Sequence, residues 1–526
     1  HLIVPRLDEE PWPSLGGAVC DFIEERFVFG PGPLNGQPAV ISDEKRAIIW
    51  RLYEVNPKGH RLPGRRRFKR GGWSVRKGMA KALALDTRIP TPSGWTRMGD
   101  LKVGDLVFDE KGQPVRVSAT SPVYLGNDCY RVTFKDGSSI VADADHRWYT
   151  EELRRQRDEH GVLRAYVGSV KTTAELAQTV TLRKDGARNH RIPVTRPLDL
   201  PDAELPIDPW VLGAWLGDGR TDDAEFTMHP ADHEHFVAKV ELAGYFHRPP
   251  KVDTRTEAGV YAVRVSTSTI ARGGYRYGLD TLKGRLDENG LLGNKHVPAA
   301  YLRASLPQRL AVLQGLMDTD GTITPDGSNA AFTSTVQALA DGVYELMCSV
   351  GLKPTVKPFT TAAGTPAWKV SVFADAATPI FSLPRKYARQ REACNRTAMS
   401  SNRHIVSVEP VPSVPTRCIA VDSESHLFLA GKAMVPTHNT ELGAWIVGVE
   451  LHPEGPVRGD GFDAYGNPVG RPVASPYIPM LSYTKDQTEE LAYGALKAIL
   501  ENSTDADLFD IGQERILRYD HRGRED

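Results

Sequence analysis

Short segments of alternating apolar and polar residues, separated by turn signals, fill the chain from about residue 100 onward. Residues 104–108 lead through Lys111-Gly112 to Val115-Arg116-Val117, and residues 129–134 lead through Asp136-Gly137 to Ser139-Ile140-Val141. A Gly-containing turn between two such segments predicts a β-hairpin. Similar short segments return at 418–429 and 432–435. The pattern therefore predicts a compact all-β domain whose sequence is interrupted by a long insertion.

Helical patterns lie outside and within this β region. Residues 43–53 and 489–501 read as amphipathic helices, and residues 477–483 read as a buried strand. Inside the insertion, residues 211–219 and 313–321 look alike, and each ends in an acid followed by Gly. Small residues at matching places allow two such helices to approach closely, and the acid-Gly ending favours a helix terminus. The insertion therefore reads as an α+β domain built from two related halves.

Composition limits the possibilities only slightly. A length of 526 residues is enough for several domains, and a net charge of −1 gives no indication of a partner. No run of about 18 apolar residues occurs, so no membrane span is expected. The chain starts His1-Leu2-Ile3, without Met or a signal-peptide pattern, and we expect a fragment of a longer reading frame.

The cysteines point to a reducing compartment. They form no CxxC pair and no metal-binding spacing, so we expect at most one or two of them to be chemically active. They are Cys20, Cys129, Cys348, Cys394 and Cys418.

Candidate chemistry is concentrated near residue 439. Asn439 can attack its own backbone carbonyl and cut the chain after itself. Thr440 offers a hydroxyl that can accept an acyl group, and His438 can move the protons that both steps need. Read with the segment that begins Ala82-Leu83-Ala84, this end resembles the C-terminal junction of an intein, a domain that excises itself and ligates its flanks. The resemblance implies an all-β Hint (intein/hedgehog) splicing domain that brings residues 82 and 439 together.

The first residue departs from the usual intein pattern. Most inteins begin with Cys or Ser, whereas Ala82 has no nucleophile. A set of residues elsewhere resembles the signature of class 3 inteins, which lack the first nucleophile. That set is Trp148, Cys418 and Thr437, and Trp148 follows His146 by two residues. Asp143 is a mismatch, because inteins commonly carry Thr at that place.

The class 3 resemblance implies a splicing reaction without a cofactor. Cys418 attacks the Lys81 carbonyl and releases the Ala82 amine, and Thr440 then takes the acyl group. Asn439 cyclises, and an acyl shift joins Lys81 to Thr440. His146 would protonate the leaving amine or twist the scissile amide, while Trp148 and Thr437 would orient Cys418 and His438 would assist Asn cyclisation.

Three alternatives remain open at this stage. The first is an intein that is inactive in splicing, or one engineered to carry Ala82, whose insert only binds DNA. The second is an autoprocessing domain that cleaves without ligation, against which the Asn439-Thr440 end argues. The third is that each residue alone has an ordinary structural role, since a lone buried Cys usually behaves as a small hydrophobe.

The two similar segments in the insertion resemble the LAGLIDADG motif of homing endonucleases. The resemblance implies that Asp218 and Asp320 converge, hold Mg²⁺ and support cleavage of double-stranded DNA. Strands after each helix would lie in the DNA major groove. Lys369 and Arg264 occupy comparable places on those strands, and both are candidates for supporting positive charge.

Joining the flanks would create a different motif. Arg76-Lys77-Gly78-Met79-Ala80-Lys81 would run directly into Thr440, which looks like an irregular Walker A loop that binds ATP and Mg²⁺. Such basic, degenerate loops resemble those of tailed-phage terminase large subunits, which implies a DNA-packaging motor with terminase and portal partners. The alternative is an unrelated basic loop joined by chance to Lys-Thr.

We therefore expect a multidomain phage protein of the bacterial cytoplasm, without membrane contact. Its predicted parts are split α/β P-loop NTPase flanks at 1–81 and 440–526, a splicing domain at 82–194 and 396–439, and an α+β LAGLIDADG endonuclease at 195–395.

Overall fold

The computed structural model describes most of the chain. The described residues are 12–29, 36–41, 43–67, 82–158, 161–180, 189–253, 260–266, 281–374, 376–392, 401–423, 425, 427–437, 442–474, 476, 478, 493–512 and 515–519. The chain forms two compact units. The flank unit comprises residues 1–77, 422–426 and 439–526, and the central unit comprises residues 78–421 and 427–438.

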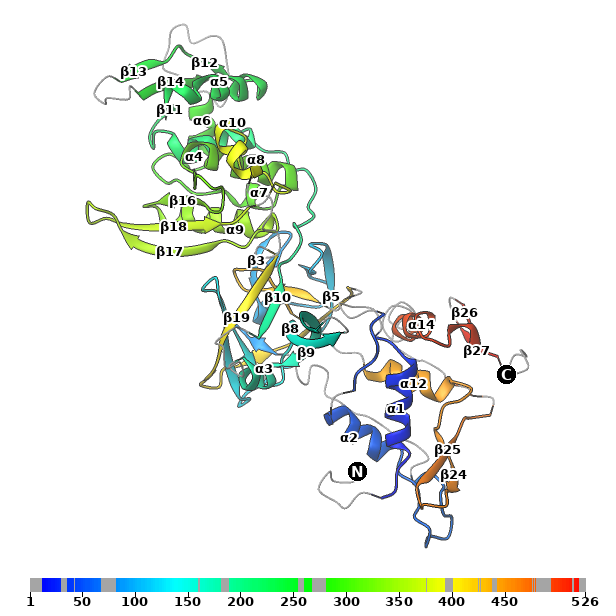
Figure 1. Ribbon diagram of the computed structural model, residues 1–526. Helices are drawn as coiled ribbons and strands as arrows, with labels where there is room; N and C mark the ends of the chain where they lie inside the picture. The colour runs from blue at the N-terminus through cyan, green and yellow to red at the C-terminus, as the bar shows by residue number, and fades with distance from the viewer. Residues whose placement is uncertain are drawn as a thin grey trace. The chain divides into compact units, whose positions relative to one another are not determined.

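The central unit has a β-rich part formed by both ends of its sequence (Figure 1). The hairpins predicted from the turn signals are present as antiparallel pairs β4–β5 and β6–β7. Gly137 sits in the β6–β7 turn with φ 86, a left-handed conformation that favours Gly. The elements are β1 (Leu83–Ala84), β2 (Arg88–Thr91), β3 (Gly94–Arg97), β4 (Leu106–Phe108), β5 (Pro114–Thr120), β6 (Cys129–Phe134), β7 (Ser139–Asp143), β8 (Arg147–Asp158), β9 (Gly161–Thr172), α3 (Thr173–Thr179), β10 (His190–Pro193), β19 (Asn402–Val411), β20 (Thr416–Arg417), β21 (Ile419–Val421), β22 (Phe428–Ala430) and β23 (Val435–Thr437).

Strands from the two ends of the sequence share one sheet. Its order is β20-β1-β7-β6-β19-β10-β8-β9, so β1 lies between β20 and β7. A second sheet, β21-β5-β4, also joins late and early segments. The segments that begin at Leu83 and end at Thr437 therefore belong to one folded part despite the insertion between them.

The insert part contains two helices that carry the similar sequence segments, each followed by an antiparallel sheet. The sheets are β11-β14-β12, with β13 also on β14, and β15-β16-β18-β17. The elements are α4 (Pro209–Asp218), β11 (Glu225–Met228), α5 (His233–Leu242), β12 (Phe246–His247), β13 (Lys251–Asp253), β14 (Val260–Ser266), α6 (Leu282–Glu288), α7 (Ala299–Leu302), α8 (Leu306–Thr319), β15 (Thr322–Ile323), β16 (Ala330–Ser334), α9 (Gln337–Ser349), β17 (Thr355–Thr360), β18 (Pro366–Val372) and α10 (Pro384–Glu392).

Local sequence explains where the two similar helices begin. The Asp208 side chain accepts a hydrogen bond from Val211 N, and Pro209 occupies the first turn of α4. Ser305 and Gln308 form a capping box before α8. The insert also contacts the β-rich part, because Arg303 Nε donates to Thr91 O at 2.8 Å.

The flank unit is held together by residues from both ends of the chain. Residues of α1 and α2 such as Ile23 and Ile49 share one hydrophobic core with Val449 and Ile499. Its elements are α1 (Gly16–Arg26), α2 (Asp43–Leu52), α12 (Leu442–Leu451), β24 (Arg458–Phe462), β25 (Pro468–Arg471), α14 (Gly494–Glu501), β26 (Phe509–Ile511) and β27 (Ile516–Arg518). Burial of apolar surface from both flanks in one core indicates that they fold as parts of one domain.

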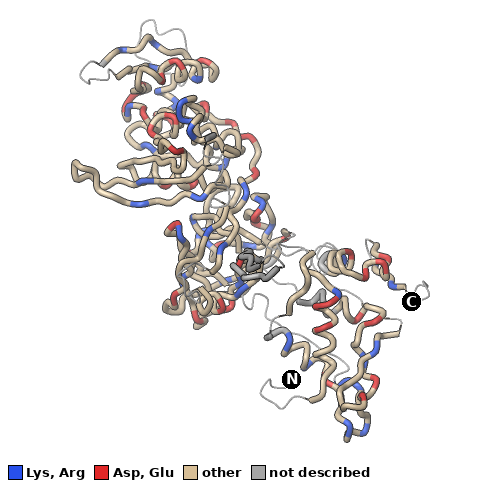
Figure 2. Tube along the Cα trace, in the orientation of Figure 1, with Lys and Arg blue, Asp and Glu red and all other residues tan. Residues whose placement is uncertain are grey.

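Several predicted features of the flanks lie partly or wholly outside the described residues. The predicted helix at 43–53 corresponds to α2, and the predicted helix at 489–501 corresponds to α14, which begins later. The predicted strand at 477–483 is described only at residue 478. Within the described residues, none of the helices combines the length and hydrophobicity needed to cross a bilayer. Figure 2 shows acidic and basic residues interspersed along the described chain.

Candidate functional site

The register of β20, β1 and β7 defines the first candidate site. Leu83 pairs with Arg417 on one side and with Ala142 on the other. One residue further along these antiparallel strands, Cys418 and Asp143 flank Ala82. Asp143 N donates to Ala82 O at 3.0 Å, so the register on that side continues to Ala82. In-register residues of neighbouring strands have Cα atoms about 5 Å apart and side chains on one face. Cys418 and Asp143 thus lie next to the residue where the intein would begin.

Ser121 holds the backbone of Cys418. The Ser121 Oγ accepts a hydrogen bond from Cys418 N at 3.0 Å, and Ser121 N donates to Cys418 O at 2.9 Å. Cys418 is almost fully buried, with 4% exposure. Two hydrogen bonds to one residue fix the backbone that carries the thiol. Sequence reasoning missed Ser121, because it lies in a segment with no motif.

His146 is the centre of a buried polar cluster. Its Nε2 and Thr437 Oγ1 form a hydrogen bond, and its ring packs edge-on against Trp148 with centroids 4.8 Å apart. Trp148 Nε1 donates to Thr173 Oγ1 at 3.0 Å, and Thr173 Oγ1 donates to His146 O at 3.1 Å. These contacts of Trp148 and Thr437 orient His146, and the expectation that both residues also orient Cys418 stays a prediction. Thr173, at the start of α3, was missed as a member.

The last residues of the expected splicing junction lie outside the described part of the chain. These are His438, Asn439 and Thr440 on one side and Lys81 on the other. Their predicted roles therefore stay predictions. The same holds for Arg76, Lys77 and Gly78, the expected phosphate-binding loop. The structure does describe α12, which begins at Leu442, as expected for a helix that follows such a loop.

The second candidate site lies at the ends of α4 and α8. The helices touch at glycines: a Cβ on Gly213 would lie 2.1 Å from Val312 O, and one on Gly315 would lie 2.2 Å from Trp210 O. Such distances are shorter than a van der Waals contact, so only Gly allows this backbone approach. The predicted role of small residues between the two helices agrees with this geometry.

We expected the glycine after each acid to end its helix through its backbone conformation, but the structure shows a different reason for glycine. Gly219 has φ −73, which any residue adopts. A Cβ there would lie 2.5 Å from Trp215 O, and one on Gly321 would lie 2.3 Å from Met317 O. Close packing of the chain against the end of its own helix therefore requires these glycines.

Asp218 and Asp320 meet where the two helices end. Burial raises the pKa of Asp218, and the charge of Asp320 and a hydrogen bond with it raise this pKa further. Two carboxylates close enough to share a hydrogen bond repel each other when both are ionised. A divalent cation bound by both would relieve that repulsion, so the pair fits the Mg²⁺ predicted from the sequence.

Two lysines that the sequence analysis missed lie beside the two acids. Lys295 Nζ donates to Gly217 O at 3.0 Å and to Gly219 O at 2.6 Å. Lys386 Nζ donates to the carbonyl oxygens of Met317, Asp318, Thr319 and Gly321 at distances of 2.6 to 3.1 Å. Each lysine thus caps the carbonyl end of one helix. Burial lowers the pKa of each lysine to about 8.

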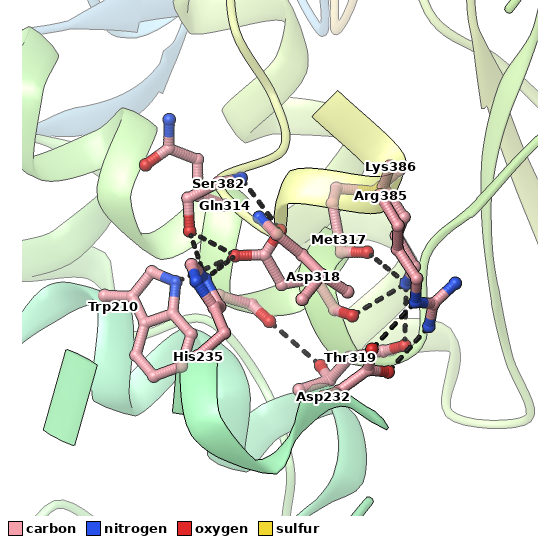
Figure 3. Close-up of polar contacts among 12 residues, drawn as sticks. Trp210, Asp232, His235, Gln314, Met317, Asp318, Thr319, Ser382, Arg385 and Lys386 are labelled. Carbon is pink, nitrogen blue, oxygen red and sulfur yellow. Dashed lines mark hydrogen bonds and ion pairs between the residues drawn. The ribbon is translucent and has the colours of Figure 1, made fainter. Parts of the chain in front are cut away.

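Asp318 fixes the segment that carries Lys386 (Figure 3). Its carboxylate accepts hydrogen bonds from Ser382 N and Leu383 N at 2.8 Å and from Trp210 Nε1 at 3.0 Å. Leu383 directly precedes α10, so this carboxylate ties α10 to α8. The only sequence signal was that Asp318 lies two residues before Asp320 in the repeated segment.

Lys369 lies on a strand after α8, as expected from the sequence, and its role in supplying positive charge stays a prediction. It is an exposed residue of β18, paired with Thr333 on β16 and Lys357 on β17. Asp320 leads into β15, and β16 lies between β15 and the strand β18 that carries Lys369. Arg264 lies on β14, where Asp223 binds it. The buried Lys295 and Lys386 lie nearer to the acids, where their charges act on Asp218.

Comparison with known proteins bears on these sites. Residues 307–375 match the model of a LAGLIDADG-like domain. The chain is 40% identical over 382 residues to a replicative DNA helicase DnaB of Mycobacterium intracellulare, covering 70% of this chain and 60% of that protein. A DnaB of Mycobacterium leprae is 53% identical over 77 residues, covering 15% of this chain and 13% of that protein. The chain thus spans about 60% of the length of the first of these relatives.

Two solved structures also align with parts of this chain. The splicing domain of the Msm DnaB1 intein with zinc aligns at 20% identity over 68% of this chain and 100% of that chain, with a TM-score of 0.21. I-DmoI in complex with its target DNA and manganese aligns at 13% identity over 32% of this chain and 86% of that chain, with a TM-score of 0.21.

These comparisons give no support to a terminase host, because both of these relatives are named replicative DNA helicase DnaB. The chain contains a LAGLIDADG-like domain and is related in sequence to mycobacterial proteins named replicative DNA helicase DnaB.

Proposed function

We propose that the chain is a self-splicing precursor, in which residues 82–439 are a class 3 intein that excises itself and joins Lys81 to Thr440. The observation that carries this proposal is the pairing of Leu83 with Arg417, because Ala82 and Cys418 are the next residues along the two strands. Cys418 directly follows the neighbouring strand β20 and carries a nucleophilic thiol, whereas Ala82 itself adds only a methyl group. The buried contacts of His146 with Thr437 and Trp148 further support the assignment.

The proposed reaction balances without a cofactor. The Cys418 thiol loses its proton, Sγ bonds to the Lys81 carbonyl carbon, and the C–N bond electrons and one proton go to Ala82 N. Thr440 Oγ then loses its proton and displaces Sγ, which regains one. The Asn439 side-chain nitrogen attacks the Asn439 carbonyl and frees the Thr440 amine. That amine finally displaces Oγ and forms the new Lys81–Thr440 peptide bond.

Mass spectrometry of the expressed chain tests this proposal. The wild-type chain should yield the free segment 82–439 and a product in which 1–81 is joined to 440–526, whereas Cys418→Ala should yield neither. Cys129→Ala, which changes another buried cysteine of the β-rich part, should splice like wild type. Splicing by Cys418→Ala, or intact wild-type precursor, would refute the proposed mechanism.

We further propose that the LAGLIDADG-like domain is a DNA endonuclease. Asp218 and Asp320 would hold Mg²⁺, whose positive charge would stabilise charge that develops on a scissile phosphate. Lys295 and Lys386 would add positive charge next to the acids, and their restraint by main-chain carbonyls keeps them in place. The support is the convergence of both acids and both lysines at the ends of the paired helices.

For the joined flanks we propose only a P-loop ATPase domain. Support comes from the core that both flanks share and from α12, which follows the Lys81–Thr440 junction. A terminase and a DnaB-type helicase are both DNA motors of this class. The spliced product should be retained on immobilised ATP with Mg²⁺ and the Cys418→Ala precursor should not, because Lys81 and Thr440 are adjacent only after splicing. Equal retention of both would contradict this proposal.

A further inference from the structure

Asp143 stands out in the β-rich part because it is a buried acid at a position where inteins commonly carry Thr. It ends β7 and is only 3% exposed. Its backbone already engages two residues of the splicing site, since its N–H donates to Ala82 O at 3.0 Å and its carbonyl accepts from His146 N at 3.2 Å. A carboxyl group with these backbone contacts is fixed next to the bond that the proposed reaction breaks.

The carboxyl group of Asp143 is incompletely satisfied by the protein. Asn127 Nδ2 donates to Oδ2 at 3.2 Å, whereas Oδ1 is buried and has no partner of good hydrogen-bond geometry among the described residues. A buried polar atom without a partner costs free energy and is uncommon in folded proteins. The buried Oδ1 of Asp143 can therefore carry a proton and pass it to a reacting group.

The leaving nitrogen is close to this carboxyl. Burial raises the pKa of Asp143 to about 6, and the charge of Asp145 contributes to the increase. A hydrogen bond from Asn127 and the backbone N–H groups of Ala82 and His146 oppose the increase. The Ala82 carbonyl accepts from Asp143 N, and the N–H and C=O of one extended residue point to the same side, so the Ala82 N–H also points toward Asp143. The Ala82 N–H belongs to the amide that Cys418 would attack.

One ring nitrogen of His146 is already used in a hydrogen bond with a group other than Ala82 N. Its Nε2 binds Thr437 Oγ1. Breaking the Lys81–Ala82 bond leaves an amine nitrogen that needs a proton, because an amide anion is a very poor leaving group. The Ala82 backbone lies beside Asp143, whose Oδ1 is buried and makes no hydrogen bond of good geometry to the described residues.

We propose that Asp143 is the general acid of the first splicing step and transfers its proton to Ala82 N as Cys418 Sγ forms its bond to the Lys81 carbonyl carbon. The C–N bond electrons go to the nitrogen, and the carboxyl becomes a carboxylate that regains a proton from solvent. That proton replaces the one that the Cys418 thiol released to solvent. This inference rests on the proposed splicing function and adds a catalytic residue to it.

The proposal predicts a particular pH profile. The reactive form combines a protonated Asp143 with an ionised Cys418. Below the Asp143 pKa of about 6, the rate rises about tenfold per pH unit with the thiolate fraction. Above it, loss of the Asp143 proton cancels the gain in thiolate, so the rate is level up to the pKa of the thiol. Asp145 and His146 are the titratable groups beside Asp143 that could also affect the profile.

The test isolates the first step in the full chain with Asn439→Ala, which stops the reaction at the branched stage. The rate of N-flank release with hydroxylamine would be measured between about pH 5 and 9. Asp143→Asn should lower that rate about 100-fold at pH 7, the usual contribution of a general acid. It should also remove the level region, so that the rate rises continuously with the thiolate fraction. Asp145→Asn should keep the level region.

Each outcome decides the proposal. A wild-type rate and profile in Asp143→Asn would overturn it. If circular dichroism shows that Asp143→Asn does not fold, the same rates would be measured for Asp143→Thr, which should also lack the level region. The wild-type pH profile would then provide the second test. A wild-type rate without a break near pH 6 would also overturn the proposal. Cys418→Ala, measured in parallel, separates the two proposals: release of the N-flank at the wild-type rate by this variant would refute the splicing function itself.

Discussion

Replacing Asp218 and Asp320 together by Asn should reduce DNA cleavage by at least about 1,000-fold, because several kcal/mol of charge stabilisation depend on the bound cation. The two carboxylates are adjacent and would share Mg²⁺ at the ends of α4 and α8. Cleavage of a DNA library with Mg²⁺ measures the effect. DNA binding should persist, because the substitution also removes negative charge that repels phosphates.

A matched control separates the acids from general charge effects. Asp222→Asn removes an exposed acid that is paired with Arg220 and should leave cleavage unchanged. Lys386→Met should also reduce cleavage, whereas Lys369→Met should not reduce it comparably, since Lys369 is exposed on β18. Cleavage that survives in the double Asn variant would show that these acids do not form the active site. Binding without cleavage by the wild-type chain would favour the alternative that the insert only binds DNA.

Replacing Arg403 by Met should lower the free energy of unfolding of the central unit by about 3 to 5 kcal/mol, because it leaves a buried carboxylate without its cation. The Arg403 and Asp136 side chains form an ion pair and are 0% and 1% exposed. Ser138 N donates to Asp136 at 3.0 Å, but this bond is not enough to replace a charge. Denaturant unfolding of a splicing-blocked precursor, Cys418→Ala with Asn439→Ala, measures the change.

Two further variants test whether the unpaired buried carboxylate of Asp136 causes the loss of stability. Arg403→Met combined with Asp136→Leu should recover much of the stability, since an apolar pair can replace a buried ion pair. Arg191→Met breaks a partly exposed pair with Glu151 and should cost at most about 1 kcal/mol. Equal losses for Arg403→Met and Arg191→Met would contradict the argument from burial.

The Arg403–Asp136 ion pair also lies at the contact between the β-rich part and the insert. Burial raises the pKa of Cys348 on α9 to about 12, and the charge of Arg403 opposes that increase. Lys353 Nζ, from the segment after α9, donates to Asn402 O at 2.5 Å. Charged residues of the β-rich part thus lie against α9 of the insert. Unfolding of the two parts should therefore be coupled.

The sequence alone determined the local elements and the order of the parts. Turn signals predicted the hairpins β4–β5 and β6–β7, and both are present because a Gly-containing turn fixes a local structure. The repeated segments predicted two helices that approach through Gly213 and Gly315, because only glycine permits such contact. The sequence also singled out Asp218 and Asp320, of which Asp320 lies within the residues that match a LAGLIDADG-like domain.

Only the tertiary structure decided which side chains meet. The β20-β1-β7 register brings Cys418 and Asp143 beside Ala82, although they are far apart in sequence. Lys386 reaches the end of α8 because Asp318 holds the segment before α10, and no spacing rule encodes that contact. Strand pairing and buried polar contacts depend on residues distant along the chain. A local pattern therefore predicts the element, while the fold determines the partners.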